Sequence, residues 1–544
     1  MLARGNAAGT DAWPWACLPQ AVCTTVNSML GPQRMHIDDL IEWRRVEEIL
    51  PFVGPLEIEL MCGPSEHQRS LRGVWPRRVD GLALVAPMMT SCKGCRFIET
   101  LFDELQQFHG LKSLRLKVHQ SFAVDAIEKL SQFVKTTKSL ERLVMETAVQ
   151  GEAGLLLNAL EKNTSIEMLD LAGNYINSES ATVLGNVLQT NSQLKSLYLA
   201  DNYLHAPGGV ALGQGLQVNQ GLVYLDLCGN GIRDEGCIAI CSALKQNVSL
   251  QKLVLFDNCI TSVGGQAIAE MLGENKHLKQ LSLAFNGLGH ESTTRLFESL
   301  ERNVSLEFLD LSNVYLDDAL GFDRWVQPLA SNTTLETLLL CGSQLGFNFV
   351  SCIFGQALRQ NTQLQNLDIS GNAFSSESIE CMFENMKLDL SVKEIHLRQQ
   401  GMLLHDIQAI CNVVCMDTCV LEVLDIAGNN ISEQGAVAFG EALKTNKHLR
   451  NLDLSNNPIK TQGLCAILTG INAGSCLRVL RLANADLVPS DSCLIARFLQ
   501  TNSSLEQLDI SGNEMTYTDE WKESGAWHSS LPYVWNLIPQ KRFF

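Results

Sequence analysis

Apolar residues recur along most of this chain at a fixed interval. From residue 166 to 316, six segments begin 28 residues apart, and each is close to L-x-x-L-x-L-x-x-N-x-L/I. Three of them are IEMLDLAGNYI at 166, LVYLDLCGNGI at 222 and LEFLDLSNVYL at 306. A constant period of this length indicates stacked repeats, in which each unit is buried only by its neighbours.

The pattern extends to both sides of this stretch. Fifteen units, mostly 28 or 29 residues apart, begin at Leu111, Leu140, Ile166, Leu194, Leu222, Leu250, Leu278, Leu306, Leu335, Leu364, Val392, Leu421, Leu449, Leu477 and Leu505. The leucine positions and the period together predict leucine-rich repeats, in which the apolar residues point inward from a short strand.

An asparagine follows the strand in nine units, where the chain must turn away from the sheet. These are Asn174, Asn202, Asn230, Asn258, Asn286, Asn372, Asn429, Asn457 and Asn513. A side-chain amide can both donate and accept, so stacked asparagines are predicted to form a ladder that satisfies buried backbone groups. Val314, Ser343 and Gln400 take this position in three units, which predicts a weakened ladder there.

Between strands the apolar spacing becomes helical. Ala181, Leu184 and Leu188 lie on one helical face, and Asn191 ends the segment. An asparagine recurs at this ending position, and we interpret it as a left-handed helix terminus. Strand and helix in alternation predict an α/β leucine-rich repeat solenoid (horseshoe) of about 15 repeats of 28–29 residues. The parallel sheet should line the concave face and the helices the convex face, because helices are wider than the strand spacing.

The two ends of the chain do not repeat. We predict an N-terminal flank and cap at 1–110, the repeat array at 111–515 and an aromatic-rich cap or tail at 516–544. Residues 36–50 have helical spacing, while residues 58–60 and 82–84 resemble degenerate repeats. The flank is interpreted as a cap or as a separate docking region, and the tail as a cover for the last coil or as a docking segment.

Charge and composition narrow the partners. Lys and Arg number 41 against 59 Asp and Glu, a net charge of −18, which argues against nucleic acid and favours a basic protein partner. No apolar run approaches the roughly 18 to 20 residues that span a bilayer. The eighteen cysteines lack a regular framework spacing, so we expect reduced thiols and a cytoplasmic location.

The sequence contains few motifs that indicate catalysis or ligand binding. It has no G-x-x-x-x-G-K-[ST], H-E-x-x-H or G-x-S-x-G motif, so we expect no enzyme activity, no catalytic residues and no cofactor. Cys92 and Cys95 form a lone C-x-x-C, interpreted as free thiols. Cys411, Cys415 and Cys419 would line one helix and are interpreted as buried small apolar residues. No metal site is predicted.

The candidate partner-binding residues lie on the concave side. The position between the second and third strand leucines is Asp in seven units, including Asp170, Asp226 and Asp310. Outward strand positions of five successive units carry Tyr198, Tyr224, Phe256, Phe285 and Phe308, with Asp257 beside Phe256. Aromatic rings bordered by carboxylates are typical of a protein-binding strip. The alternative is that L-D-L is favoured by the repeat itself and that the aromatic residues arose separately.

The 28/29 alternation, the L-D-L-S/A-G-N-x-I strands and the N-x-S-L helix ends resemble the ribonuclease-inhibitor-like class of leucine-rich repeats. Over residues 111–515 they are most similar to the repeat regions of CARD-group NOD-like receptors, whose nucleotide-binding domain has no counterpart here. The resemblance implies a non-enzymatic scaffold that binds a protein on its concave face, in a regulatory or assembly role. The alternatives are a GTPase activator resembling the Ran GTPase-activating proteins and a ciliary or cytoskeletal assembly component.

Overall fold

The computed structural model describes residues 33–37, 56–61, 81–86, 111–118, 124–146, 153–316, 321–388 and 391–515. The chain divides into two compact units, Met1–Leu253 (unit 1) and Val254–Phe544 (unit 2), and each is described by itself.

In unit 1, strands and helices alternate from residue 113 onward. The strands are β1 (Gln33–Ile37), β2 (Leu56–Met61), β3 (Gly81–Ala86), β4 (Ser113–Val118), β5 (Arg142–Glu146), β6 (Met168–Asp170), β7 (Ser196–Tyr198) and β8 (Tyr224–Asp226). The helices are α4 (Val124–Thr136), α5 (Ala153–Leu160), α6 (Ser178–Thr190), α7 (His205–Leu216) and α8 (Arg233–Leu244), and β9 (Lys252–Val254) lies at the boundary.

Unit 2 continues the same alternation. Its strands are β10 (Gln280–Ser282), β11 (Phe308–Asp310), β12 (Thr337–Leu339), β13 (Asn366–Asp368), β14 (Glu394–His396), β15 (Val423–Asp425), β16 (Asn451–Asp453), β17 (Val479–Arg481) and β18 (Gln507–Asp509). Its helices are α9 (Ser262–Glu274), α10 (His290–Leu300), α11 (Asp323–Ser331), α12 (Phe347–Cys352), the π-helix η3 (Ile353–Ala357), α13 (Ser376–Met386), α14 (Leu404–Val414), α15 (Glu433–Leu443), α16 (Lys460–Asn472) and α17 (Asp491–Thr501).

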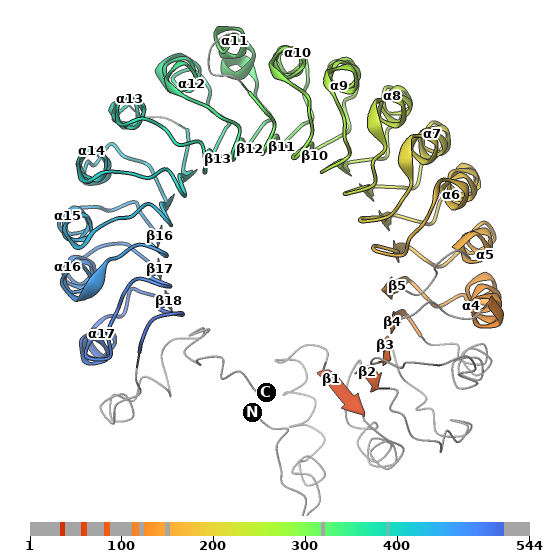
Figure 1. Cartoon of the computed structure of the whole chain (residues 1–544), viewed down its shortest axis with the longest axis horizontal. Helices are drawn as coiled ribbons and strands as arrows, with labels where there is room; N and C mark the ends of the chain where they lie inside the picture. The colour runs from red at the N-terminus through yellow and green to blue at the C-terminus, as the bar shows by residue number, and fades with distance from the viewer. Residues whose placement is uncertain are drawn as a thin grey trace, which may run out of the picture. The chain divides into compact units, whose positions relative to one another are not determined.

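Neighbouring strands in each unit pair in parallel and in one register. Leu169 of β6 lies opposite Leu197 of β7, and Leu197 lies opposite Leu225 of β8. Within each unit the strands follow the inner, shorter arc and the helices the outer one (Figure 1). The predicted α/β solenoid is therefore confirmed, and β4 to β18 begin within two residues of the predicted starts.

The core of each unit lies between its strands and its helices. The middle residue of each short strand is buried, as Leu169, Leu197 and Leu225 show. Leu184 and Leu188 of α6 are buried on the opposite side of the same core. Each coil therefore has an apolar interior that only the coils beside it can cover.

The predicted asparagine ladder is confirmed. The Asn202 Nδ2 atom donates to the Leu171 carbonyl of the preceding coil at 2.9 Å. Its Oδ1 atom accepts from the backbone N–H groups of Asn174 and Ile176 at 3.0 and 2.8 Å. One side chain thus satisfies three backbone groups that water cannot reach.

The ladder is weakened less than the sequence predicts. The Gln400 Nε2 atom donates to the Ile369 carbonyl at 3.0 Å, and its Oε1 atom accepts from the Phe374 N–H at 3.2 Å. Ser343 donates its hydroxyl to the Leu311 carbonyl at 3.1 Å. In the described part of the array, two buried side chains at this position have no polar group and cannot take part: Val314, and Ala485 in the unit that begins at Leu477.

The asparagines that end the helices form a second ladder, and the left-handed interpretation is wrong. Asn191 has φ −85° and ψ 115°, which is extended backbone, and Asn275 and Asn332 are also extended. The Asn191 Nδ2 atom donates to the Leu160 carbonyl at 2.7 Å, while Oδ1 accepts from the Leu194 N–H at 3.0 Å. Asparagine is needed here for its amide and not for its backbone freedom.

The helices around the units that contain Val314 and Ser343 form an aromatic cluster. Trp325 is fully buried and stacks on Phe297, with ring centroids 3.7 Å apart. Its Nε1 atom donates to the Thr294 hydroxyl at 3.1 Å. Phe322 and Phe349 approach the indole edge to face. Trp325 therefore belongs to the core and is not part of a contact surface.

The N-terminal flank contributes strands to unit 1. β1 pairs with β2, β2 with β3 and β3 with β4, all in parallel. His36 and Ile37 are in β1, so the helix expected over residues 36–50 does not begin there. The remainder of that segment and the tail from residue 516 lie outside the described residues. No helix in the described part is long and apolar enough to cross a bilayer.

Candidate functional site

The sheet face opposite the helices, here called the open face, carries the candidate residues. Because alternate side chains of a strand point to opposite sides, the first and third residues of each short strand lie on the open face. In β6, β7 and β8 these residues are half-buried, while the middle leucine is buried.

In unit 1 the open face holds two tyrosines in contact. The rings of Tyr198 in β7 and Tyr224 in β8 lie with their centroids 4.6 Å apart. The ammonium group of Lys252 lies 5.1 Å from the centroid of the Tyr224 ring, within the range of a cation–π interaction. The structure thus brings together two of the five predicted aromatic residues.

Two of the predicted carboxylates flank this pair. The Tyr224 hydroxyl donates to Asp226 Oδ2 at 3.5 Å. Burial raises the pKa of Tyr224, and the negative charge of Asp226 raises it further. Burial and the charge of Asp170 likewise raise the pKa of Tyr198. Burial raises the pKa of Asp226. The hydrogen bonds from the Cys228 N–H and the Tyr224 hydroxyl lower this pKa, but burial is the larger effect. Both phenols are neutral at physiological pH, so their rings and the carboxylates supply the recognition chemistry.

The strand aspartates also have a structural role, which the sequence alone did not show. In every one of the seven units, Oδ1 accepts a hydrogen bond from the backbone N–H two residues ahead. The residues are Asp170, Asp226, Asp310, Asp368, Asp425, Asp453 and Asp509. This bond explains why L-D-L recurs, which favours the alternative interpretation for the aspartates as a class.

In unit 2 the predicted aromatic residues are not all on strands. Phe256 follows β9, Phe285 follows β10, and their centroids lie 4.8 Å apart. Phe285 is exposed and has a φ of 57°, so it belongs to a turn. Their assignment to outward strand positions is therefore wrong. Phe308 begins β11 as predicted and is half-buried.

The two remaining predicted carboxylates of unit 2 differ in their environment. Asp257 is exposed in the turn after Phe256 and has a φ of 48°. Asp310 ends β11, and its Oδ2 atom accepts from the Ser282 hydroxyl at 2.8 Å. The predicted strip is thus resolved into an aromatic pair in each unit, Tyr198 with Tyr224 and Phe256 with Phe285.

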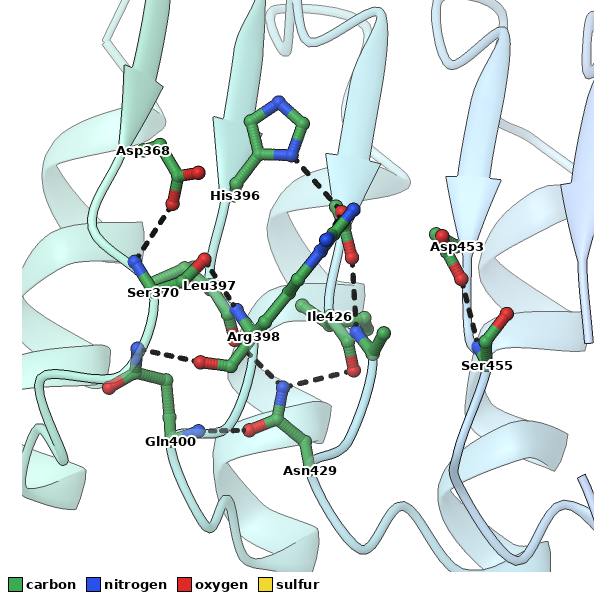
Figure 2. Close-up of polar contacts among 12 residues, drawn as sticks. Asp368, Ser370, His396, Leu397, Arg398, Gln400, Ile426, Asn429, Asp453 and Ser455 are labelled. Atoms are coloured by element: carbon green, nitrogen blue, oxygen red, sulfur yellow. Dashed lines mark hydrogen bonds and ion pairs between the residues drawn. The ribbon is translucent and has the colours of Figure 1, made fainter. Parts of the chain in front are cut away.

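Unit 2 also contains a charged cluster that the sequence did not single out (Figure 2). His396 ends β14, and its Nδ1 atom lies 3.1 Å from Oδ2 of Asp425 in β15. Arg398, two residues after His396, forms an ion pair with the same oxygen atom. The Asp425 side chain is only 3% exposed, whereas that of Arg398 is 54% exposed.

The pKa shifts in this cluster have clear causes. The hydrogen bond to Asp425 raises the pKa of His396 above 6.5, although burial opposes the shift. Burial alone would raise the pKa of Asp425, but the bonds from His396, the Ala427 N–H and Arg398 outweigh it, so the pKa is lowered. Asp368 and Asp453, which end β13 and β16, add negative charge to the same face.

The signal for this cluster was present in the sequence. His396 takes the strand position that is Asp in the neighbouring units that contain Asp368 and Asp425. A cationic side chain between two such carboxylates predicts an ion pair once the register is known. The spacing of the repeats gives that register, because equivalent positions of neighbouring units lie opposite each other in the sheet.

Cys411 lies in α14, Cys415 is the residue at which this helix ends, and Cys419 lies beyond it, so the prediction that the three line one helix is wrong. Cys411 and Cys419 are buried, as predicted, and burial raises the pKa of both thiols. Cys415 is only half-buried, so its predicted burial is wrong, and its thiol donates to the Asn412 carbonyl. Within the described ranges, no three His, Cys, Asp or Glu side chains gather into a set that could hold a metal ion. Cys92 and Cys95 lie outside those ranges.

Comparison with known proteins agrees with the repeat assignment. A sequence profile of the family described as Leucine Rich repeat matches residues 218–241, 246–269, 274–292, 419–440, 445–468 and 501–518. The search of curated proteins gave no match.

Several solved structures resemble the chain at low identity. The TLR13–ssRNA13 complex matches at 17% identity and a TM-score of 0.46, over 87% of this chain and 55% of that one. This chain therefore spans about 55% of the length of that protein. Internalin C2 from Listeria monocytogenes matches at 18% identity and a TM-score of 0.29, over 46% and 84% of the two chains. The tropomodulin C-terminal domain of Caenorhabditis elegans matches at 18% identity and a TM-score of 0.24, over 28% and 90%.

The matched segments fall in both units. The first five each contain a strand and at least the start of the helix that follows it, and the segment 501–518 contains β18. The chain therefore carries leucine-rich repeats, and its described part is an α/β leucine-rich-repeat solenoid.

Proposed function

We propose that the chain is a non-enzymatic scaffold that binds a protein partner on its open face. The observation that carries this proposal is the contact pair of Tyr198 and Tyr224. Both rings are half-buried on a sheet whose strands are fixed by the ladder and by buried leucines. Large rings held in place lose little entropy on binding, which is why tyrosine is common at binding hot spots. Asp170 and Asp226 border this pair in unit 1, and Phe256, Phe285 and Phe308, with Asp257 and Asp310, form the proposed binding surface of unit 2.

The proposed partner is a basic protein. The whole chain has a net charge of −18, and seven of its described strands end in an aspartate on the open face. Charge complementarity of this kind accelerates association and excludes acidic partners such as nucleic acid. The proposal includes a cytoplasmic location and a regulatory or assembly role, by resemblance to the repeat regions of NOD-like receptors.

The test is affinity capture with the full chain from cells that express it. Tyr198→Ser/Tyr224→Ser should abolish capture of the specific partners, and Phe256→Ser/Phe285→Ser should weaken it. Val304→Ser is the matched control, because Val304 is 59% exposed and lies in the connection between α10 and β11. Circular dichroism should show all three variants folded.

The same proteins captured equally by all variants would overturn the proposal. If the captured partner is a G protein, the rate of GTP hydrolysis with and without the chain decides between a scaffold and the GTPase-activating alternative. Stimulated hydrolysis would favour the GTPase activator.

A further inference from the structure

Unit 1 contains two further tyrosines that are exposed. Both are close in sequence to the Tyr198–Tyr224 pair. Tyr175 and Tyr203 each follow a ladder asparagine, in the turns after β6 and β7. Their side chains are 45% and 50% exposed, and their ring centroids lie 5.8 Å apart. Tyr175, Tyr198, Tyr203 and Tyr224, here called the tyrosine surface, are four of the seven tyrosines in the chain. Such concentration in three successive coils calls for a function.

The backbone of the exposed pair is held in place. Tyr175 has a φ of 57°, which is a costly conformation for a bulky residue. The ladder side chain of Asn202 fixes it by accepting from the N–H groups of Asn174 and Ile176 on either side. The Tyr203 N–H donates to the Ile176 carbonyl at 2.8 Å. The two rings are therefore presented to solvent by a rigid turn.

Carboxylates lie beside the strand tyrosines of this surface, Tyr198 and Tyr224. Asp170 and Asp226 lie on the open face, and Asp201 is exposed in the turn just before Asn202 and Tyr203. The negative charges of Asp170 and Asp201 both raise the pKa of Asp226, so the three groups are close enough to interact. The surface therefore combines electron-rich ring faces with a local excess of negative charge.

One cation of the chain itself already occupies this surface. The Lys252 ammonium group lies 5.1 Å from the Tyr224 ring centroid. It is the intramolecular counterpart of the contact that a basic partner would make. A segment of apolar or acidic side chains would leave the carboxylates desolvated or repelled, whereas lysine or arginine would pair with them.

We propose that the tyrosine surface binds an extended protein segment through its lysine and arginine side chains, seated on the tyrosine rings and paired with Asp170, Asp201 and Asp226. This inference rests on the proposed scaffold function and names the chemistry of its partner. Tyr175, Tyr203 and Asp201, which the sequence interpretation did not include, belong to the site.

The experiment measures fluorescence anisotropy of two labelled peptides with the full chain. One peptide alternates arginine and serine, and the other replaces each arginine with citrulline, which has nearly the same shape without the charge. We expect the arginine peptide to bind at least about tenfold more tightly, because several cation–π and ion-pair contacts add. Tyr203→Phe should retain this affinity, and Tyr203→Leu should lower it roughly threefold, since only the latter removes the ring.

Two further variants sharpen the test. Lys252→Ala should strengthen binding of the arginine peptide, because it frees the Tyr224 ring and removes a repelling charge. Tyr315→Leu should leave binding unchanged, because Tyr315 is 59% exposed at the corresponding turn position of unit 2. Asp201→Asn should weaken binding of the arginine peptide and leave the citrulline peptide unaffected.

Equal affinity for the two peptides, or equal effects of Tyr203→Leu and Tyr315→Leu, would overturn the inference. The experiments distinguish failure of this inference from failure of the proposed scaffold function. If Tyr198→Ser/Tyr224→Ser abolishes protein capture while the peptides bind equally, the scaffold proposal stands and the cation-specific inference fails. If capture is unchanged by that variant, the scaffold site itself is wrong.

Discussion

The two carboxylate oxygen atoms of a single strand aspartate can have different partners. In Asp425, Oδ1 accepts from the Ala427 N–H at 3.2 Å, while Oδ2 is shared by His396 and Arg398. The first bond closes the turn after the strand and recurs in every unit with L-D-L. The second oxygen atom remains for the open face. A residue kept by the repeat for structure can therefore also hold charged side chains of the open face, such as the exposed Arg398, in place.

The His396–Asp425 pair predicts a pH dependence of stability. The pKa of His396 is raised above 6.5, so its stabilising contribution is complete below pH 6.5 and is lost as pH rises through the higher folded value. The pKa of Asp425 is lowered below 3.8, so its contribution holds above that pH and is lost on further acidification. His396→Asn should therefore lower the free energy of unfolding more at pH 6 than at pH 8.5, by about 1 kcal/mol.

Urea denaturation at the two pH values measures this difference. His277→Asn is the control, because His277 is an exposed histidine of the same unit. Equal losses at pH 6 and pH 8.5 for His396→Asn would show that the histidine acts only through packing.

Helices α15 and α16 of unit 2 approach each other closely at a position where both carry glycine. Gly440 in α15 and Gly470 in α16 face each other, and a Cβ atom on Gly470 would lie 2.2 Å from the Gly440 carbonyl oxygen. No neighbouring side chain can move to make room, because the obstacle is backbone. The helix spacing in this part of unit 2 is thus set by the absence of two methyl groups.

Two glycine-to-alanine changes should have opposite effects. Gly470→Ala should lower the free energy of unfolding by about 2 kcal/mol, because it forces α15 and α16 apart. Gly273→Ala in α9 should raise it by about 0.5 kcal/mol, since its nearest neighbour is an ordinary 4.0 Å from the new Cβ and alanine is the better helix former. Thermal unfolding followed by circular dichroism measures both. A Gly470→Ala variant with an unchanged midpoint would contradict the packing argument.

The positions of the strands were easier to predict from the sequence than the roles of individual residues. The period of the leucines located the strands, because only inward side chains recur at every turn of the solenoid. Periodicity does not distinguish a strand residue from the turn that follows it, which is why Phe256 and Phe285 were misplaced. It also cannot say why a residue recurs. The helix-ending asparagines were explained by backbone conformation, whereas their side-chain amides are what the neighbouring coil requires.

At the scale of the chain, the candidate site was predictable only in part. Tyr198 and Tyr224 could be found because they take strand positions whose direction the repeat determines. Tyr175 and Tyr203 were missed, because an aromatic residue after the ladder asparagine carries no signal of exposure. The His396 cluster was missed because it depends on which side chain lies opposite which in neighbouring strands.

The net charge of the chain predicts how it meets its proposed partner. With a charge of −18, attraction to a basic protein acts over roughly 10 Å at about 0.1 M salt and over shorter distances as the salt concentration rises. Raising the salt concentration from about 50 to 300 mM should slow association by at least about tenfold and change dissociation much less. Surface plasmon resonance with the captured partner measures both rates. A salt-independent association rate would argue against a basic partner.

The second asparagine ladder also affects how the chain can be modified. Asn163, Asn247, Asn303 and Asn332 each begin an N-x-S/T triplet, the acceptor sequence for N-linked glycans. All four side chains are buried, at 1–3% exposure. The Nδ2 atoms that a sugar would occupy instead donate to carbonyl groups of the preceding coil. Once folded, the array has no room for a glycan at any of these four acceptor sites.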